Sequence, residues 1–160
     1  MVPDNFRLLK ARWPELYQHA SLAERYVFAD PHTAAIKLRC FAEVLVGLLY
    51  RDLSLPSEPT DGFFEKLKYP AFQDVVGYIV LQKLHALRMI GNKAAHGGFI
   101  DSSVSLSLIE DAYLIGLWFY KTYSGESADT YPPFTVPVEA TEQGSPVEDR
   151  AEQLALAKDE

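Results

Sequence analysis

Three polar residues whose types could bind a ligand or do chemistry, Arg88, Asn92 and His96, stand four positions apart. On a helix this spacing stacks their side chains along one stripe. An arginine can hold a phosphate group and a histidine can transfer a proton, so the stripe has the residue types of an anion-binding or acid–base site. The stripe also borders an apolar face, where polar atoms need hydrogen-bond partners.

Arg39 and Glu43, which are also four positions apart, are the expected partners of this stripe. They lie in a segment that is apolar almost all round, and a charged pair in such a place is costly unless it is hydrogen-bonded. We therefore predict a buried structural network in which Asn92 and His96 hydrogen-bond to Arg39 or Glu43 and fix the helix register. A catalytic or binding role of the same residues is the alternative.

The cysteine and the other histidines lack the neighbouring residues that a catalytic or metal site would need. Cys40 is the single cysteine, which excludes an intramolecular disulfide and an all-cysteine metal site. No third ligand stands at a zinc-like spacing from His85, so we predict no metal site. His19 and His32 are expected to be exposed to solvent. The sequence has no Gly-x-x-x-x-Gly-Lys-Ser/Thr loop that would bind nucleotide phosphates.

Helix signals are dense before Tyr123 and strand signals are scarce. Asp30 precedes a proline, which is typical of a helix start. We predict an all-α bundle domain at residues 1–123, with about five or six helices and the 31–50 helix in its middle. The expected helices cover residues 5–12, 15–29, 31–50, 61–68, 72–96 and a last segment that begins after Asp101, Ser102 or Ser103 and ends at Tyr123.

Residues 124–160 change in composition to Pro, Glu, Thr, Ser and Gly. We expect an acidic, extended tail or linker that leads into a longer parent protein. Its 131–138 segment is held extended by three prolines, and 148–158 is too short to form a stable helix alone. The tail carries the whole net charge of −7, because residues 1–123 contain thirteen acidic and thirteen basic residues. This neutral body is a poor match for non-specific nucleic-acid binding.

The chain shows no targeting or membrane signal. Residues 1–10 include Asp4, Arg7 and Lys10 where a signal peptide needs an apolar run. No uncharged stretch approaches the roughly 20 residues of a membrane-spanning helix. We therefore predict a cytoplasmic protein with no membrane contact.

Three parts of the chain carry a resemblance to a known family. They are residues 30–43, residues 84–96, and residues 117–120 together with 132–134. In this order they resemble the N-terminal helical domain of the R (HsdR) subunit of type I restriction enzymes, over about residues 6–137. The run Arg-x-x-Gly-Asn-x-Ala-x-His is the most specific part of the likeness.

In that family the domain precedes a nuclease module and an ATP-driven DNA translocase. The resemblance implies a parent enzyme of the type I site-specific deoxyribonuclease class, which uses ATP and Mg²⁺ and defends against foreign DNA. It implies methylation and specificity subunits as partners, and double-stranded DNA as the substrate of the parent. None of the motor or nuclease residues occurs in this chain, so the implied role is a non-catalytic assembly or DNA-proximal domain that holds no cofactor itself.

The helical bundle is also similar, more distantly, to the HEPN superfamily, whose ribonucleases carry an Arg-x(4 to 6)-His motif. In this chain Gly91 takes the place of that arginine, and seven residues separate Arg88 from His96. A free-standing ribonuclease or toxin-type protein is therefore one alternative. A helical protein-interaction module is another; it is compatible with a homo-oligomer, and its surface would include Trp118, Phe119, Tyr120 and Tyr123.

Overall fold

The computed structural model describes residues 2–139 and contains helices but no strand within them. The predicted all-α class is therefore confirmed. Among the described helices, none has the length and apolar character that crossing a membrane requires. The expected 148–158 helix lies outside the described residues. The elements are η1 (Arg7–Leu9), α1 (Pro14–Tyr26), α2 (Pro31–Asp52), α3 (Phe63–Lys68), α4 (Pro70–Ala95) and α5 (Ser102–Tyr123).

Two helix starts follow from capping side chains that are visible in the sequence. The carboxylate of Asp30 accepts the backbone N–H of Thr33 at 3.1 Å, at the beginning of α2. Asp101 accepts the N–H of Val104 at 3.0 Å, at the beginning of α5. Each bond satisfies a donor that the first helical turn leaves free, which explains why these two boundaries agree closely with the prediction.

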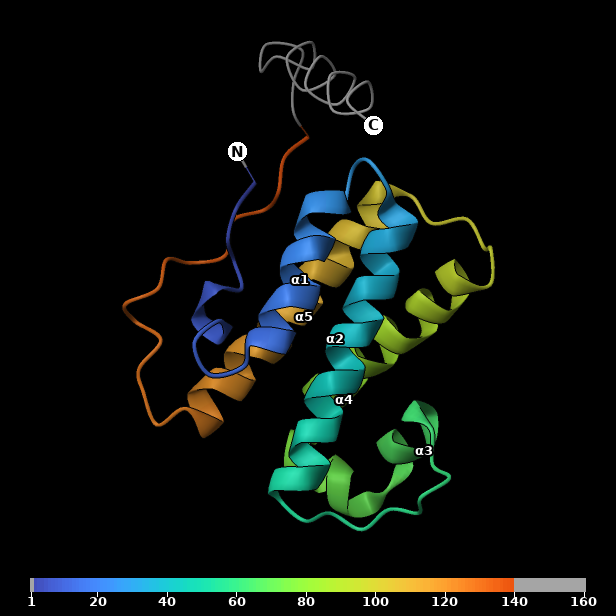
Figure 1. Cartoon of the computed structure of the whole chain (residues 1–160), viewed down its shortest axis with the longest axis vertical. Helices are drawn as coiled ribbons and strands as arrows, with labels where there is room; N and C mark the ends of the chain where they lie inside the picture. The colour runs from blue at the N-terminus through green and yellow to red at the C-terminus, as the bar shows by residue number, and fades with distance from the viewer. Residues whose placement is uncertain (1, 140–160) are drawn as a thin grey trace, which may run out of the picture.

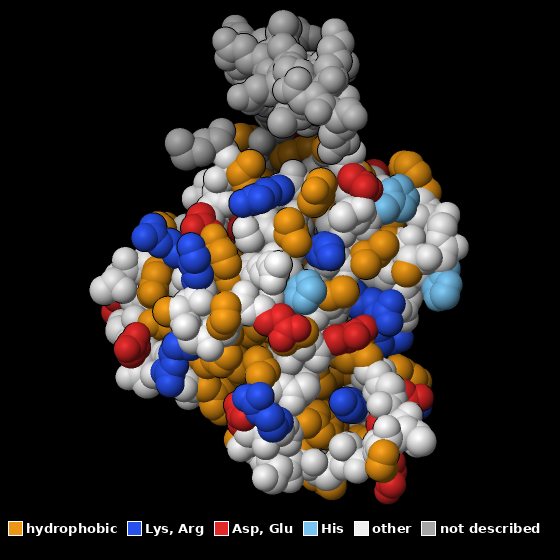
Figure 2. Space-filling view, viewed as in Figure 1, with side chains coloured by type: hydrophobic (Ala, Val, Ile, Leu, Met, Phe, Trp, Pro, Cys, Tyr) orange, Lys and Arg blue, Asp and Glu red, His pale blue; other side chains and the backbone are white. Residues whose placement is uncertain are grey.

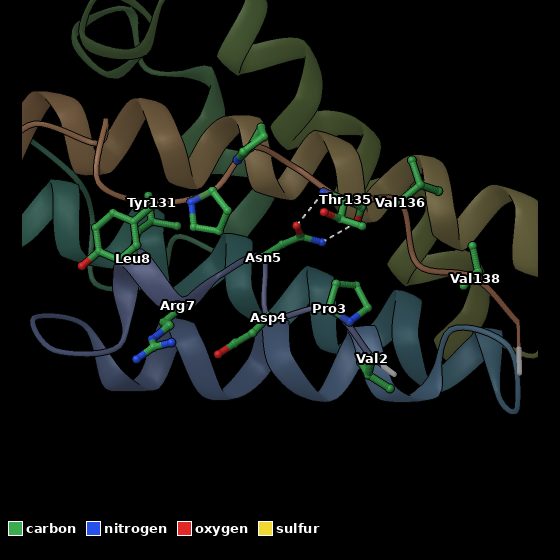
Figure 3. Close-up of a pocket in the computed structure, with 12 residues that line it drawn as sticks. Val2, Pro3, Asp4, Asn5, Arg7, Leu8, Tyr131, Thr135, Val136 and Val138 are labelled. Atoms are coloured by element: carbon green, nitrogen blue, oxygen red, sulfur yellow. Dashed lines mark hydrogen bonds between the residues drawn. The ribbon is translucent and has the colours of Figure 1, made fainter. Parts of the chain in front are cut away.

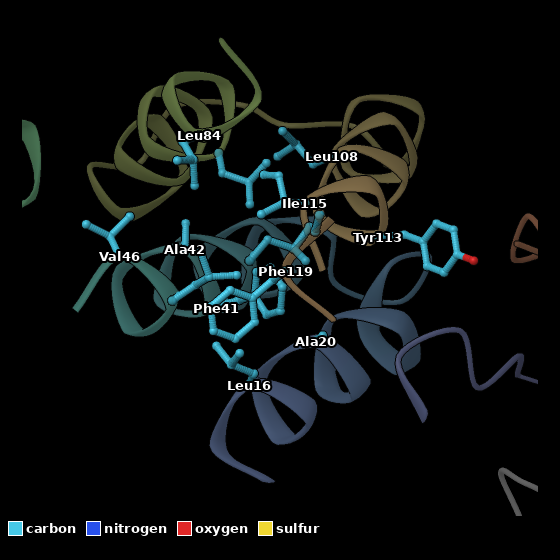
Figure 4. Close-up of a cluster of buried hydrophobic side chains, with 14 of the residues drawn as sticks. Leu16, Ala20, Phe41, Ala42, Val46, Leu84, Leu108, Tyr113, Ile115 and Phe119 are labelled. Carbon is cyan, nitrogen blue, oxygen red and sulfur yellow. The ribbon is translucent and has the colours of Figure 1, made fainter. Parts of the chain in front are cut away.

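Helix α2 lies at the centre of the bundle and packs against α1, α4 and α5 (Figure 1). Its side chain Phe41 is fully buried, and the ring of Phe6 packs against it edge-on at 5.7 Å. Figure 4 shows the core built from all four long helices: Leu16 and Ala20 of α1, Phe41, Ala42 and Val46 of α2, Leu84 of α4, and Leu108, Ile115 and Phe119 of α5. The predicted central place of the 31–50 helix is confirmed.

Helix α4 departs from the prediction of one continuous helix over 72–96. It begins two residues earlier, and Gly77 interrupts it with φ +77° and ψ 171°. Glycine reaches this backbone conformation without steric cost, whereas other residues do not. The interruption is followed by Tyr78 and Ile79, which are 77% and 71% exposed. The predicted 5–12 helix is also wrong in extent, because only Arg7–Leu9 forms a short 3-10 turn.

The described part of the tail returns along the bundle instead of extending away from it (Figure 1). The ring of Tyr131 packs edge-on against Tyr120 at 5.7 Å, and the ring of Phe134 lies 5.0 Å from Tyr113. Residues 131–138 are outside any helix, as the three prolines predicted. This segment therefore runs antiparallel to the N-terminal residues, and the two ends of the described chain lie at the same end of the bundle.

Candidate functional site

The predicted pair of Arg39 and Glu43 is present on α2, but it is not buried. The Nε atom of Arg39 lies 2.8 Å from Oε1 of Glu43, and the two side chains are 32% and 40% exposed. The N–H of that nitrogen does not point at the oxygen, since Nε has no hydrogen-bond partner. The contact is an ion pair that water screens in part, so its contribution to stability is small.

The close contact between α2 and α4 at this point is made by a glycine. A β-carbon on Gly91 would stand 2.5 Å from Cβ of Arg39 and 3.2 Å from the backbone oxygen of Ala35. Gly91 is buried, and its missing side chain lets the two helices approach closely. The relative position of α2 and α4 is therefore set by backbone packing and not by a polar network.

The predicted buried network through Asn92 and His96 is wrong. Asn92 is half-buried and His96 is exposed. Within residues 2–139, no hydrogen bond joins either of them to Arg39 or Glu43. The physical reason is the end of α4 at Ala95, which leaves His96 at the helix C-terminus, beyond the last full turn that faces α2. A binding role of these residues stays a prediction.

Arg88 points toward α3 and takes part in a separate cluster. Its guanidinium carbon lies 4.6 Å from the ring centre of Phe64, and Nζ of Lys68 lies 4.2 Å from the same centre. Its Nη2 atom is 3.4 Å from Nδ1 of His85. Burial, together with the charge of Arg88, lowers the pKa of His85, so the imidazole is neutral at pH 7. Arg88 therefore contacts α3 and shows no contact with His96.

Two histidines that were expected to be exposed are half-buried instead. Nε2 of His32 accepts the backbone N–H of Ile100 at 3.1 Å, which ties the start of α2 to the loop before α5. Nδ1 of His19 is buried without a partner, and burial lowers its pKa, with a smaller effect from Lys37. The expectation of exposure was wrong because both rings face neighbouring elements that the local sequence does not reveal.

The aromatic residues of α5 belong mainly to the core. Phe119 and Tyr120 are buried, and the ring of Trp13 packs 4.5 Å from Phe119. Trp118 and Tyr123 are half-buried and pack against each other at 5.9 Å. This set therefore offers little free aromatic surface for a partner. Cys40, on α2, is half-buried.

Glu24 is the most unusual ionisable residue of the described fold, and it was not predicted from the sequence. This α1 side chain is 3% exposed, and its Oε2 accepts a hydrogen bond from Nδ2 of Asn5 at 2.9 Å. Oε1 has no partner. Burial raises the pKa of Glu24 to about 8, although the hydrogen bond from Asn5 acts in the opposite direction. A glutamate between Ala23 and Arg25 carries no local signal of this burial.

Asn5 connects Glu24 to the returning tail, and Figure 3 shows its two hydrogen bonds with Thr135. Its Nδ2 donates to the backbone oxygen of Thr135 at 2.8 Å, and its Oδ1 accepts the N–H of Thr135 at 2.9 Å. A groove of about 350 Å³ lies between the two segments. It is lined mostly by apolar side chains, among them Val2, Pro3, Leu8, Tyr131, Pro133 and Val136.

Across the described part of the chain, no group of three or more His, Cys, Asp or Glu residues is placed to hold a metal ion. The residues thus define a helical bundle domain with a partly exposed polar stripe on α4, a cation cluster around Phe64 and a buried carboxyl beneath the N-terminal segment. No family model matches the chain. No solved structure matches it either.

The chain is similar to the type I restriction enzyme EcoKI endonuclease subunit of Escherichia coli (strain K12), with 28% identity over 137 residues. The match covers 86% of this chain and 12% of that subunit. The chain therefore spans a small part of the length of this relative.

Proposed function

We propose that this chain is a helical assembly domain of a type I restriction R subunit, whose parent enzyme translocates and cleaves DNA with ATP and Mg²⁺. The observation that supports the proposal is the 28% identity to a type I restriction endonuclease subunit over 137 residues, which is 86% of this chain. The domain role itself is non-catalytic. It contacts the methylation and specificity subunits, or lies close to the bound DNA.

The geometry of the α4 stripe favours contact over catalysis. The charge of Arg88 lies against Phe64, and His96 is exposed at the end of α4, so the two groups do not converge on one point. On the face shown in Figure 2, Lys and Arg side chains are interspersed with acidic and apolar ones. A mixed surface of this kind suits a protein partner better than the uniform charge of a DNA backbone.

The proposal is tested first by the mass of the native gene product in its source cell. An antibody raised against this chain should detect a band several times larger than 18.0 kDa. A band at 18.0 kDa would contradict the proposal, because the motor and nuclease modules would then be missing from the protein.

The contact role is tested in the full R subunit with the double change Arg88→Ala and His96→Ala. We expect the affinity for the complex of methylation and specificity subunits to fall at least about tenfold, since hot spots of an interface carry most of its binding energy. The matched control is Arg25→Ala with Lys121→Ala, which removes two exposed charges from α1 and α5. An affinity within about twofold of the wild type in the first variant would exclude this surface as the contact.

A ribonuclease function is the second candidate, and one observation favours it. Arg88 forms no ion pair among the described residues, so no carboxylate competes with a phosphate for the guanidinium that packs on Phe64 and His85. The purified protein is incubated with labelled single-stranded RNA, beside a His96→Ala variant. Cleavage that His96→Ala abolishes would support the ribonuclease, and RNA that stays intact would end this candidate.

A further inference from the structure

Glu24 lies in a place that disfavours its negative charge. Its carboxyl is buried beneath the N-terminal segment, and no Lys, Arg or His stands within ion-pair distance of it in the part of the chain that is described. The charged group that acts on it is Asp4 of the N-terminal segment, which opposes a second negative charge. Tyr17 of α1 interacts with Asp4 and with Arg25. Burial raises the pKa of Tyr17 above its ordinary value of 10, so its hydroxyl stays neutral wherever Glu24 titrates.

Burial favours the neutral form of Glu24, because Oε1 has no hydrogen-bond partner in either form and an unpaired O–H costs less than an unpaired negative charge. Since Oε2 accepts from Asn5, the proton of the neutral carboxyl belongs on Oε1, the oxygen without a partner. In the ionised form, Oε1 would be a buried, charged acceptor without any donor. Such an atom must gain water, and burial without it is strongly unfavourable.

Water can reach Glu24 most easily where the cover is thinnest. The cover on one side is Asn5 and, through it, Thr135 of the returning tail. The tail segment 131–138 is attached by the two hydrogen bonds between Asn5 and Thr135. It is also attached by the ring contacts of Tyr131 with Tyr120 and of Phe134 with Tyr113. Val136 and Val138 are 57% and 74% exposed, so the apolar burial of this segment is confined to Pro137 and the rings of Tyr131 and Phe134.

We propose that Glu24 and Asn5 form a proton-dependent clasp. In it the protonated carboxyl holds Asn5, and Asn5 holds segment 131–138 on the bundle through the hydrogen bonds to Thr135 that Figure 3 shows. Release of the proton accompanies detachment of that segment. In the detached state the carboxyl is hydrated and ionised, and its proton goes to solvent. The clasp concerns the attachment of the tail and is independent of the restriction role.

The pH range of the clasp follows from the two states of Glu24. In the attached state burial raises the pKa to about 8, and in the hydrated state the ordinary value of 4.5 applies. Detachment therefore releases one proton between these two values. Linkage then makes the detached population rise by up to about tenfold per pH unit in this range and level off above it.

The test uses the whole chain and hydrogen exchange of the Thr135 amide, followed by NMR and corrected for the intrinsic pH dependence of exchange. Between pH 5.5 and 7.5 we expect the protection of this amide to fall by up to about a hundredfold, and to change little above pH 8.5. Amides in the middle of α2 serve as an internal reference. Protection that stays constant over this range would overturn the proposal.

Variants separate the clasp from general pH effects. Glu24→Gln keeps a neutral acceptor for Asn5, so protection of Thr135 should become independent of pH. Glu15→Gln, at an exposed position of the same helix, should behave like the wild type. A Glu24→Gln protein with the wild-type pH dependence would overturn the proposal.

A second measurement covers the case in which Glu24→Gln does not fold. The NMR contact between the rings of Phe134 and Tyr113 reports attachment without relying on the Thr135 amide. In Asn5→Ala this contact should be weak at every pH, because the link from Glu24 to the tail is gone. A contact as strong as in the wild type would show that Asn5 does not hold the segment.

Discussion

Gly91 of α4 lies directly against Arg39 of α2, so closely that a β-carbon on the glycine would stand 2.5 Å from Cβ of the arginine. The nearby backbone oxygen of Ala35, at 3.2 Å, cannot move without shifting α2. The two central helices therefore meet through a contact that allows no side chain on α4.

We expect Gly91→Ala to lower the free energy of unfolding by about 1–3 kcal/mol, because the methyl group forces α2 and α4 apart. Urea unfolding followed by circular dichroism measures the change. Gly47→Ala is the matched control, since a β-carbon there meets nothing within 4 Å and alanine favours a helix. The control should be neutral or stabilising, and equal losses in both variants would contradict the close contact.

Glu24 gives a pH dependence of stability with a definite sign. Its folded-state pKa of about 8 lies above the ordinary 4.5, so the folded protein keeps a proton that the unfolded chain releases. The contribution of this residue is therefore fully present below pH 4.5 and is lost as the pH rises toward 8, at up to about 1.4 kcal/mol per pH unit.

Glu24→Gln should remove this fall of the free energy of unfolding with rising pH. The free energy of unfolding of the variant, relative to that of the wild type, should therefore rise from pH 5 to pH 8. Unfolding in urea at both values provides the comparison. Histidines such as His85, whose pKa is lowered, act in the opposite direction in both proteins and cancel in the difference. An equal difference in the free energy of unfolding between the two proteins at pH 5 and at pH 8 would contradict the raised pKa of Glu24.

Glu43→Ala should have a small effect, because the ion pair with Arg39 is exposed to solvent over about a third of each side chain. We expect a loss of no more than about 1 kcal/mol, which should shrink further in 1 M salt. Thermal unfolding at two salt concentrations measures both effects. A loss of about 3 kcal/mol or more would restore the buried network that the sequence suggested.

Gly77→Ala should destabilise the protein, because φ of +77° with ψ of 171° is a backbone conformation that only glycine adopts freely. The expected loss is about 1–3 kcal/mol, although no atom stands within 4 Å of the added methyl group. Gly47→Ala again provides the control, since it adds the same methyl group in a helical conformation. An unchanged stability would mean that α4 accepts a continuous helix through residue 77.

The features that could be predicted from the sequence are those that depend on residues close together in the chain. The starts of α2 and α5 were predictable because Asp30 and Asp101 cap helices that begin directly after them. The predicted network failed since its geometry depended on where α4 ends and how closely Gly91 approaches α2. Glu24 was not predictable, because its partner Asn5 lies 19 residues away and the tail that Asn5 binds is 130 residues further along the chain.

The antiparallel course of the N-terminal residues and segment 131–138 has a mechanical consequence (Figure 1). Because the two ends of the described chain lie together, tension applied between them peels the segments apart one contact at a time instead of shearing them along their length. The two hydrogen bonds between Asn5 and Thr135 carry the load before any helix does. The bundle would therefore lengthen at low force and keep its helical core intact.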